Sequence, residues 1–234
     1  MGQKKLLRFA AIKTFSNVLE YPERMQNHWK LFFKNDNPIT LELACGRGEY
    51  TVGLAQLFPQ KNFIGVDVKG NRMYIGAKKC LEQNLTNAAF LRTQIEMLPN
   101  YFAANEVSEI WLTFPDPQLR TSRAKKRLTH PRFLRLYQQI LQAGGTIHLK
   151  TDSPQLFSFT KKVIELYGLT LVEENDNIYS NKNIAAALQI KTFYETLDIA
   201  QSNRVHYLAF TLPAAIKDMD AELQEILKKD EQPD

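Results

Sequence analysis

The sequence holds only two cysteines, Cys45 and Cys80, and none of its apolar runs approaches the roughly 18 residues that a membrane-spanning helix needs. Two cysteines cannot build a disulfide framework, and these two stand far apart without the C-x-x-C spacing of a zinc site. The first residues also lack the apolar core and the small-residue cleavage site of a secretory signal. We therefore expect a cytoplasmic protein that binds neither a membrane nor a metal.

Acidic residues are missing from one long internal stretch. Between positions 117 and 151 there is no aspartate or glutamate. The lysines and arginines of that stretch are Arg120, Arg123, Lys125, Lys126, Arg127, Arg132, Arg135 and Lys150. The net charge is +5, and this density of cations in the middle of the chain predicts a surface that binds a polyanion.

The composition divides the chain into three segments. Residues 1–37 form a basic arm, in which four cations precede the first acid, Glu20. Residues 38–213 alternate apolar runs with amphipathic stretches and form the main domain. Residues 214–234 read as a closing helix with an acidic tail.

The alternation within the main domain predicts an α/β protein. Short apolar runs indicate seven strands, at 39–45, 62–68, 88–92, 107–114, 146–151, 169–172 and 205–212. Helical spacing between and after them indicates helices at 49–58, 72–84, 131–143, 154–167 and 214–229, and Gly144 with Gly145 is expected to end the third of these helices. Such alternation is typical of a mostly parallel sheet with helices on both faces. Ligands of these sheets bind outside the carboxyl ends of the strands.

A glycine-containing loop follows the first expected strand. It reads Glu-Leu-Ala-Cys-Gly-Arg-Gly, and the glycines Gly46 and Gly48 allow a tight turn close to a ligand. The third glycine of a dinucleotide fingerprint is absent, because Thr51 stands at its position, and no P-loop lysine follows. Asp67 ends the second strand, where a carboxylate can accept hydrogen bonds from ribose hydroxyls. The combination favours a nucleoside-binding site. Taken alone, the glycines could form a plain strand-to-helix turn, and Asp67 could be a surface acid that caps the next helix.

A stiff acidic loop follows the fourth expected strand. In the sequence Phe-Pro-Asp-Pro, two prolines fix the backbone on either side of Asp116 and present it at the carboxyl edge of the sheet. The next residues, 120–127, are rich in lysine and arginine, which bind phosphate groups. A turn with a solvated basic surface remains the alternative interpretation of each feature taken alone.

Together these motifs resemble those of the bacterial tRNA (guanine-N7-)-methyltransferases, a family of class I S-adenosylmethionine-dependent enzymes. The resemblance runs from about position 9 to position 210. It rests on LELACGRGEYT, NFIGVDVKG, the Phe-Pro-Asp-Pro loop with its basic run, the pair Thr151-Asp152, and Thr-Phe-Tyr-Glu at 192–195. The sequence departs from the family pattern at Gln94, where Asp or Asn is usual, and at Gln118, where Trp is usual.

The resemblance implies a Rossmann-like fold and the transfer of a methyl group from S-adenosylmethionine to N7 of guanine 46 in the variable loop of tRNA. It implies a catalytic role for Asp116, which lies between the cofactor and the guanine. The cofactor-binding residues that it implies are Glu42, Gly46, Gly48, Asp67, Gln94 and Asp116. The substrate-binding residues that it implies are Arg120, Asp152, Thr192 and Glu195. We expect a monomer or a homodimer with tRNA as its partner.

The chemistry of this reaction agrees with a site that is rich in acids. N7 of guanine carries a free lone pair at neutral pH, so the reaction needs alignment of the reacting atoms rather than a general base. Carboxylates can accept hydrogen bonds from N1–H and N2–H of the base and stabilise the positive charge that develops on the ring. Two other interpretations remain open: a non-catalytic RNA-binding protein with the same fold, and a small-molecule methyltransferase or nucleotide-dependent oxidoreductase.

Overall fold

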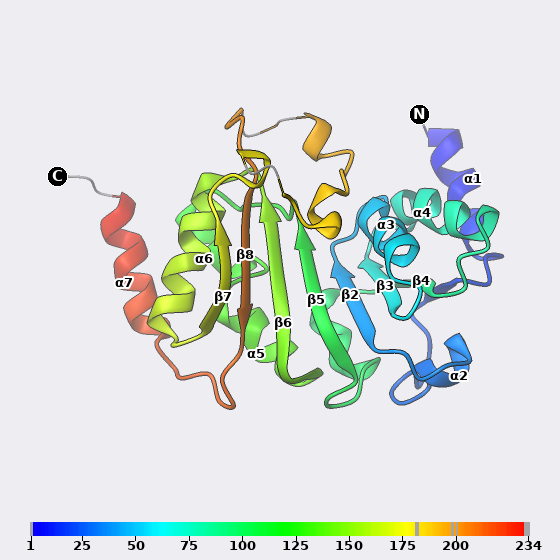
Figure 1. The fold of residues 1–234 in the computed structure, drawn as a ribbon, viewed down its shortest axis with the longest axis horizontal. Coiled ribbons are helices and arrows are strands. Elements are labelled where there is room, and N and C mark those ends of the chain that lie inside the picture. Colours follow the sequence, from blue (N-terminus) through cyan, green and yellow to red (C-terminus); the bar gives the residue numbers. More distant parts are fainter. Residues whose placement is uncertain (1, 181–182, 198, 200, 232–234) are drawn as a thin grey trace.

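The computed structural model describes residues 2–180, 183–197, 199 and 201–231, and it contains one eight-stranded sheet (Figure 1). The strand order is β1-β4-β3-β2-β5-β6-β8-β7. All neighbouring strands are parallel except β8, which runs antiparallel to both β6 and β7. The strands are β1 Val18–Glu20, β2 Ile39–Leu43, β3 Asn62–Asp67, β4 Ala88–Arg92, β5 Val107–Thr113, β6 Leu141–Thr151, β7 Thr170–Asn175 and β8 His206–Thr211.

Helices lie on both faces of this sheet, although none of them stands in front of β7 and β8 in Figure 1. In Figure 1, α3 and α4 lie in front of the sheet with α1 beside them, and α5 and α6 lie behind it. The helices are α1 Gly2–Ile12, α2 Trp29–Phe33, α3 Glu49–Leu57, α4 Gly70–Glu82, α5 Pro131–Tyr137, α6 Pro154–Leu166 and α7 Asp220–Glu231. Short 3-10 turns complete the structure: η1 Ile95–Asn100, η2 Thr121–Lys126, η3 Ile178–Ser180, η4 Ala186–Gln189 and η5 Glu195–Leu197. No helix in the described ranges is long and apolar enough to cross a bilayer.

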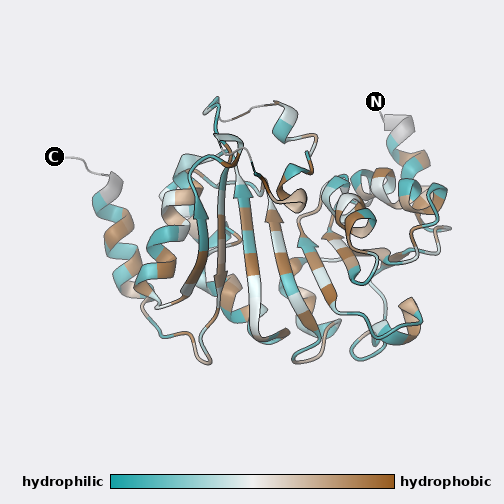
Figure 2. Ribbon diagram, in the orientation of Figure 1, coloured by the Kyte–Doolittle hydropathy of each residue, from teal (hydrophilic) through white to brown (hydrophobic). Residues whose placement is uncertain are grey.

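The central strands are buried on both faces, and their sequences reflect it. Every residue of β2 is buried, and Leu41 and Leu43 have no exposed surface. Figure 2 shows apolar residues concentrated along the central strands. One apolar cluster packs the sheet against α5 and α6, and a second packs it against α3 and α4. Covered faces explain why these strands read as nearly continuous apolar runs.

The sheet has one strand more than the sequence predicted. Residues 18–20 form β1, which pairs in parallel with β4 at the edge of the sheet. Its three residues are all only half-buried, and the segment lies within the stretch that the composition marks as a basic arm. A strand this short carries too little periodicity to be recognised, and its partner alone determines it.

Three expected boundaries are wrong. α5 ends at Tyr137, not at position 143, and β6 already begins at Leu141 and runs through Gly144 and Gly145. The glycines therefore lie inside a strand instead of ending a helix, because the register with β5 shifts between Val107 and Glu109 and admits extra residues. The closing helix begins at Asp220 instead of position 214, and residues 232–234 of the expected tail lie outside the described residues.

Candidate active site

The loop between β2 and α3 has a left-handed backbone at three positions. Ala44, Gly46 and Gly48 have φ angles of 58°, 56° and 72°. A Cβ atom at Gly48 would lie 2.8 Å from Cζ of Phe90, which is buried, so only glycine fits there. The loop therefore holds its backbone close to β3 and β4 and leaves its outer side to a ligand.

Glu42 lies under this loop with its carboxylate buried. One oxygen accepts hydrogen bonds from the backbone N–H and the hydroxyl of Thr51, at 2.8 and 2.5 Å, and the other accepts from the hydroxyl of Thr113 at 2.8 Å. Burial raises the pKa of Glu42 to about 7, although the three hydrogen bonds favour the charged form. In this arrangement Glu42 fastens α3 and β5 to the end of β2 and supports the glycine loop from below.

Asp67 and Gln94 border one cavity at the carboxyl edge, with a volume of about 330 Å³. Asp67 ends β3, where its two oxygens accept from the backbone N–H groups of Gly46 at 2.9 Å and Lys69 at 2.8 Å. Gln94 lies between β4 and η1, directly before the first residue of η1, and is exposed. The full lining is Ala44, Asp67, Val68, Thr93, Gln94, Ile95, Glu96, Lys126, Leu128, Arg132 and Phe133.

The residues of this cavity fit a nucleoside. Each oxygen of Asp67 accepts one backbone N–H and keeps a lone pair for a ribose hydroxyl. Val68 and Ile95 supply apolar surface for a planar base, and the amide of Gln94 can both donate to it and accept from it. The volume falls at the lower end of the range of about 300–1,000 Å³ for ligand pockets.

Asp116 lies outside the lining of the cavity, on the exposed loop after β5. The residues on either side of the Pro-Asp-Pro unit, Phe114 and Gln118, have φ angles of 47° and 46°. Left-handed backbone costs roughly 1–2 kcal/mol at a residue other than glycine, so the loop is held in a strained shape. Within the loop, one oxygen of Asp116 accepts from the backbone N–H of Gln118 at 3.0 Å.

Arg127 holds this loop in place. Its guanidinium donates to the carbonyl oxygens of Pro117 at 3.1 Å, Gln118 at 3.1 and 3.3 Å, and Leu119 at 3.4 Å. It lies 4.4 Å from the ring centroid of Phe159, and the residue is only 5% exposed. From the sequence we expected Arg127 to bind phosphate together with the other cations of this run. In the structure the N–H groups of Arg127 donate to the protein's own backbone, whereas Arg120, Arg123, Lys125 and Lys126 are exposed.

Glu195 belongs to a buried ion pair. Nζ of Lys150 lies 3.0 Å from one oxygen of Glu195, and the hydroxyl of Tyr179 donates to the other oxygen. Lys150 is fully buried and also donates to the carbonyl oxygens of Leu188 and Ile190, at 2.9 and 2.8 Å. Burial lowers the pKa of Lys150, and the charge of Glu195 opposes that shift. The pair fastens the segment 183–197 to the end of β6.

The other two predicted substrate residues of this region lie close by in the fold. The hydroxyl of Thr192 accepts a hydrogen bond from the backbone N–H of Glu195 at 3.1 Å, and Glu195 is the first residue of η5. Asp152 directly follows β6, and its carbonyl oxygen accepts from the hydroxyl of Ser202 at 2.9 Å. The ends of β2, β3, β5 and β6 thus bring Glu42, Asp67, Asp116, Asp152 and Glu195 to one edge of the sheet.

Sequence reasoning missed the two residues that organise this edge, Lys150 and Arg127. For Lys150 a signal existed: in the run Thr-Ile-His-Leu-Lys-Thr, alternation places His148 and Lys150 on one face of a strand in the middle of the sheet. For Arg127 no signal existed, since it belongs to a run of similar cations.

Comparison with known proteins identifies close relatives over most of the chain. A family model described as "Putative methyltransferase" matches residues 36–208. The tRNA (guanine-N(7)-)-methyltransferase of Porphyromonas gingivalis is 47% identical over 213 residues, which cover 86% of this chain and 86% of the relative. The enzyme of the same name from Bacteroides fragilis is 46% identical over 235 residues, which cover 96% of this chain and 92% of the relative.

Solved structures share the fold at low sequence identity. The 16S rRNA methyltransferase KamB superposes with a TM-score of 0.60 at 15% identity, over 80% of this chain and 94% of that one. A 30S ribosomal A1408 methyltransferase from an uncultured bacterium superposes with a TM-score of 0.55 at 16% identity, over 80% and 93% of the two chains. The expected Rossmann-like class I methyltransferase architecture is confirmed.

Proposed function

This chain belongs to the tRNA (guanine-N7-)-methyltransferase family, and we propose that it methylates N7 of guanine 46 in the variable loop of tRNA, in the cytoplasm, with S-adenosylmethionine as the methyl donor. The observation that carries the proposal is the position of the cavity beside the Asp116 loop. Lys126 and Leu128 line the cavity, and Arg127 between them holds residues 117–119 of that loop. A cofactor in the cavity and a base against Asp116 would therefore be neighbours.

On the cofactor side, the residues bind and orient. S-adenosylmethionine supplies an electrophilic methyl group on its sulfonium sulfur. We propose that Asp67 accepts hydrogen bonds from the ribose hydroxyls and that Gln94 contacts the adenine. Gly46 and Gly48 keep the loop backbone close to the ligand, and Glu42 holds that loop from below through Thr51.

On the substrate side, no residue has to remove a proton from N7. The task of the protein is to align the base with the methyl group and to exclude water. We propose that Asp116 accepts from an N–H of the guanine and stabilises the charge that develops on the ring. Thr192 and Glu195 form the wall of the base site, with Asp152 beside them and Arg120 on a phosphate. Glu195 can still accept from a base, because each carboxylate oxygen has a second lone pair.

The test is an assay of the purified protein with methyl-labelled S-adenosylmethionine and an unmodified tRNA transcript. We expect label in tRNA as 7-methylguanosine, and no label in a transcript in which adenine replaces guanine 46. Equal labelling of both transcripts would refute position 46. Binding of tRNA without any transfer of label would refute the enzymatic function and support the alternative, a non-catalytic RNA-binding protein.

A further inference from the structure

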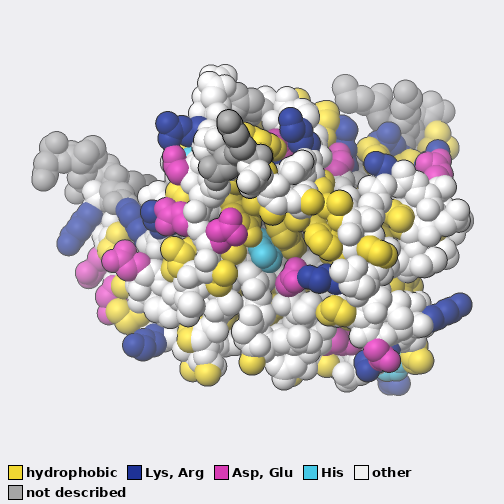
Figure 3. Space-filling model, viewed as in Figure 1, with side chains coloured by type: hydrophobic (Ala, Val, Ile, Leu, Met, Phe, Trp, Pro, Cys, Tyr) yellow, Lys and Arg dark blue, Asp and Glu magenta, His cyan; other side chains and the backbone are white. Residues whose placement is uncertain are grey.

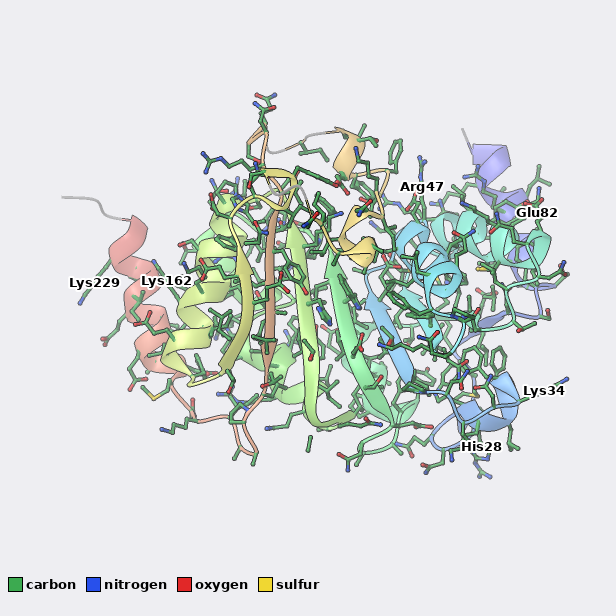
Figure 4. All side chains as sticks on the ribbon, viewed as in Figure 1. His28, Lys34, Arg47, Glu82, Lys162 and Lys229 are labelled. Atoms are coloured by element: carbon green, nitrogen blue, oxygen red, sulfur yellow. The ribbon has the colours of Figure 1, made fainter. Side chains whose placement is uncertain are left out.

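Two arginines stack on aromatic rings at the carboxyl edge. Arg47, between the glycines of the loop, places its guanidinium carbon 3.4 Å from the ring centroid of Phe193. Arg72, in the first turns of α4, lies 5.6 Å from the centroid of Tyr194. The two rings meet edge to face at 5.8 Å. Figure 4 shows Arg47 at the upper end of α3, close to the segment that carries η5.

The segment 192–197 holds these rings against the glycine loop between β2 and α3. A Cβ atom at Gly46 would lie 3.4 Å from the Tyr194 ring, so the ring packs directly on the loop. The buried ion pair of Lys150 and Glu195 anchors the same segment one residue further on. The aromatic rings under both guanidinium groups are therefore held in place by loop 44–48 on one side and by the Lys150–Glu195 ion pair on the other.

The N–H groups of both arginines find no acceptor in the part of the protein that the structure describes. Among the described residues, neither guanidinium makes a hydrogen bond or an ion pair, whereas Arg92 pairs with Glu20 and Arg135 with Asp220. A guanidinium that stacks by its face keeps the donors at its edge free for an outside acceptor. Both arginines are half-buried, so part of their desolvation is already complete before a ligand binds.

The position of this pair complements that of the basic turn η2. Arg47 lies just before α3, and Arg72 lies in α4; both helices are on the front of the sheet. Lys126 of η2 borders the cavity together with Arg132 and Phe133 of α5, behind the sheet. Figure 3 shows several Lys and Arg side chains along the upper margin of the front face. Cations thus flank the carboxyl edge from both faces, as a folded RNA that straddles the edge would require.

We propose that Arg47 and Arg72, stacked on Phe193 and Tyr194, form a second phosphate-contact surface for tRNA, on the face of the sheet opposite η2. The inference rests on the proposed function. It assigns these residues to the sugar-phosphate backbone rather than to a base, because one face of each guanidinium already lies over a protein ring and the N–H donors at its edge point past that ring.

The experiment measures the binding of a labelled tRNA transcript at increasing potassium chloride for the wild type, R47Q and R72Q. Each variant is expected to bind more weakly and to lower the slope of log K against log salt by about 1, as the loss of one phosphate contact does. The affinity for S-adenosylmethionine, measured by calorimetry, is expected to stay unchanged. The control is K78Q, because Lys78 lies on the same helix and pairs with Glu82 at 3.3 Å; its slope should equal that of the wild type.

Unchanged slopes in R47Q and R72Q would overturn the proposal. So would a loss of cofactor affinity with an unchanged slope, because the arginines would then serve the carboxylate end of the cofactor. Failure of the proposed function has a different signature: the wild type would transfer no methyl group, yet the loss of slope in the two variants would still identify the phosphate contacts.

Discussion

The ammonium group of Lys150 lies 3.0 Å from a carboxylate oxygen of Glu195, and both side chains are almost completely withdrawn from solvent. Lys150 is the last residue but one of β6, and Glu195 begins η5. Lys150 also donates to two backbone carbonyl oxygens of the same segment. Through this contact the sheet determines where the predicted base-binding residues lie.

Replacing Lys150 with methionine should destabilise the protein. The change leaves the Glu195 carboxylate buried without its cation, which costs roughly 3–5 kcal/mol. We expect urea unfolding to shift accordingly and methyl transfer to fall at temperatures where the variant is folded. The control is Lys161→Met, because Lys161 pairs with Glu174 on the surface, and loss of such a pair costs at most about 1 kcal/mol. Equal stability of the two variants would contradict the structural role of Lys150.

Arg127→Lys should lower kcat without changing the salt dependence of tRNA binding. Lysine keeps the charge but cannot donate at once to the carbonyl oxygens of Pro117, Gln118 and Leu119, so the Asp116 loop loses its support. Steady-state kinetics and salt titrations check this. Arg123→Gln is the matched change at an exposed position, and we expect it to lower the salt slope by about 1. A wild-type kcat for Arg127→Lys would contradict the role of Arg127 in holding the Asp116 loop.

Gly48→Ala should be much more harmful than Gly46→Ala. Both positions have positive φ, which costs roughly 1–2 kcal/mol for alanine. At Gly48 the new methyl group would also collide with the buried ring of Phe90, which adds about 1–3 kcal/mol of overpacking. At Gly46 it would make an ordinary contact with Tyr194. Urea unfolding and the affinity for S-adenosylmethionine should rank the two variants in this order, and a reversed ranking would refute the loop geometry.

Asp116→Asn should abolish most of the methyl transfer and leave the fold intact. Asparagine retains an oxygen that can accept from the backbone N–H of Gln118, so the shape of the loop is preserved. The negative charge proposed to stabilise the methylated base is lost. We expect a fall in kcat of at least about a hundredfold, the effect of losing one electrostatic contact in a transition state, with an unchanged thermal midpoint. Wild-type turnover would remove Asp116 from the site.

His130 makes the folded state sensitive to acid. Its Nδ1 accepts from the backbone N–H of Arg132 at 3.1 Å and caps α5, which only the neutral ring can do. Burial lowers the pKa of His130 from 6.5 to about 4. Because the pKa is lowered in the folded state, the contribution of neutral His130 to the free energy of unfolding is complete above pH 6.5 and is lost as the pH falls toward 4. Between pH 7 and pH 5 this loss is on the order of 2 kcal/mol.

His130→Asn removes this titration and keeps an acceptor at the helix cap. We expect its free energy of unfolding to fall less than that of the wild type between pH 7 and pH 5. Taking the difference between the two proteins cancels the opposite contribution of Glu42, whose raised pKa favours the folded state at low pH. Parallel pH profiles for the two proteins would show that His130 does not titrate in this range.

Local patterns in the sequence were sufficient to predict the loops at the carboxyl edge of the sheet. The glycines after β2, Asp67 at the end of β3 and the proline-bracketed Asp116 each owe their position to residues within a few places along the chain. The structure brings all three to one edge, as parallel strands require. Apolar runs that are buried on both faces likewise predicted the central strands, although the boundaries of α5 and β6 were decided by pairing with β5.

Only the tertiary structure decided which charged residues face solvent and which of them stabilise the fold. The sequence shows that Lys150 and Arg127 are cations, but it does not show which groups accept their hydrogen bonds. The acceptors of Lys150 lie 38 to 45 residues away along the chain. The acceptors of Arg127 belong to the Asp116 loop, and the strained backbone of that loop determines where they lie. The same long side chain can reach water or fold back onto a carbonyl oxygen, and only the packing around it selects one of the two.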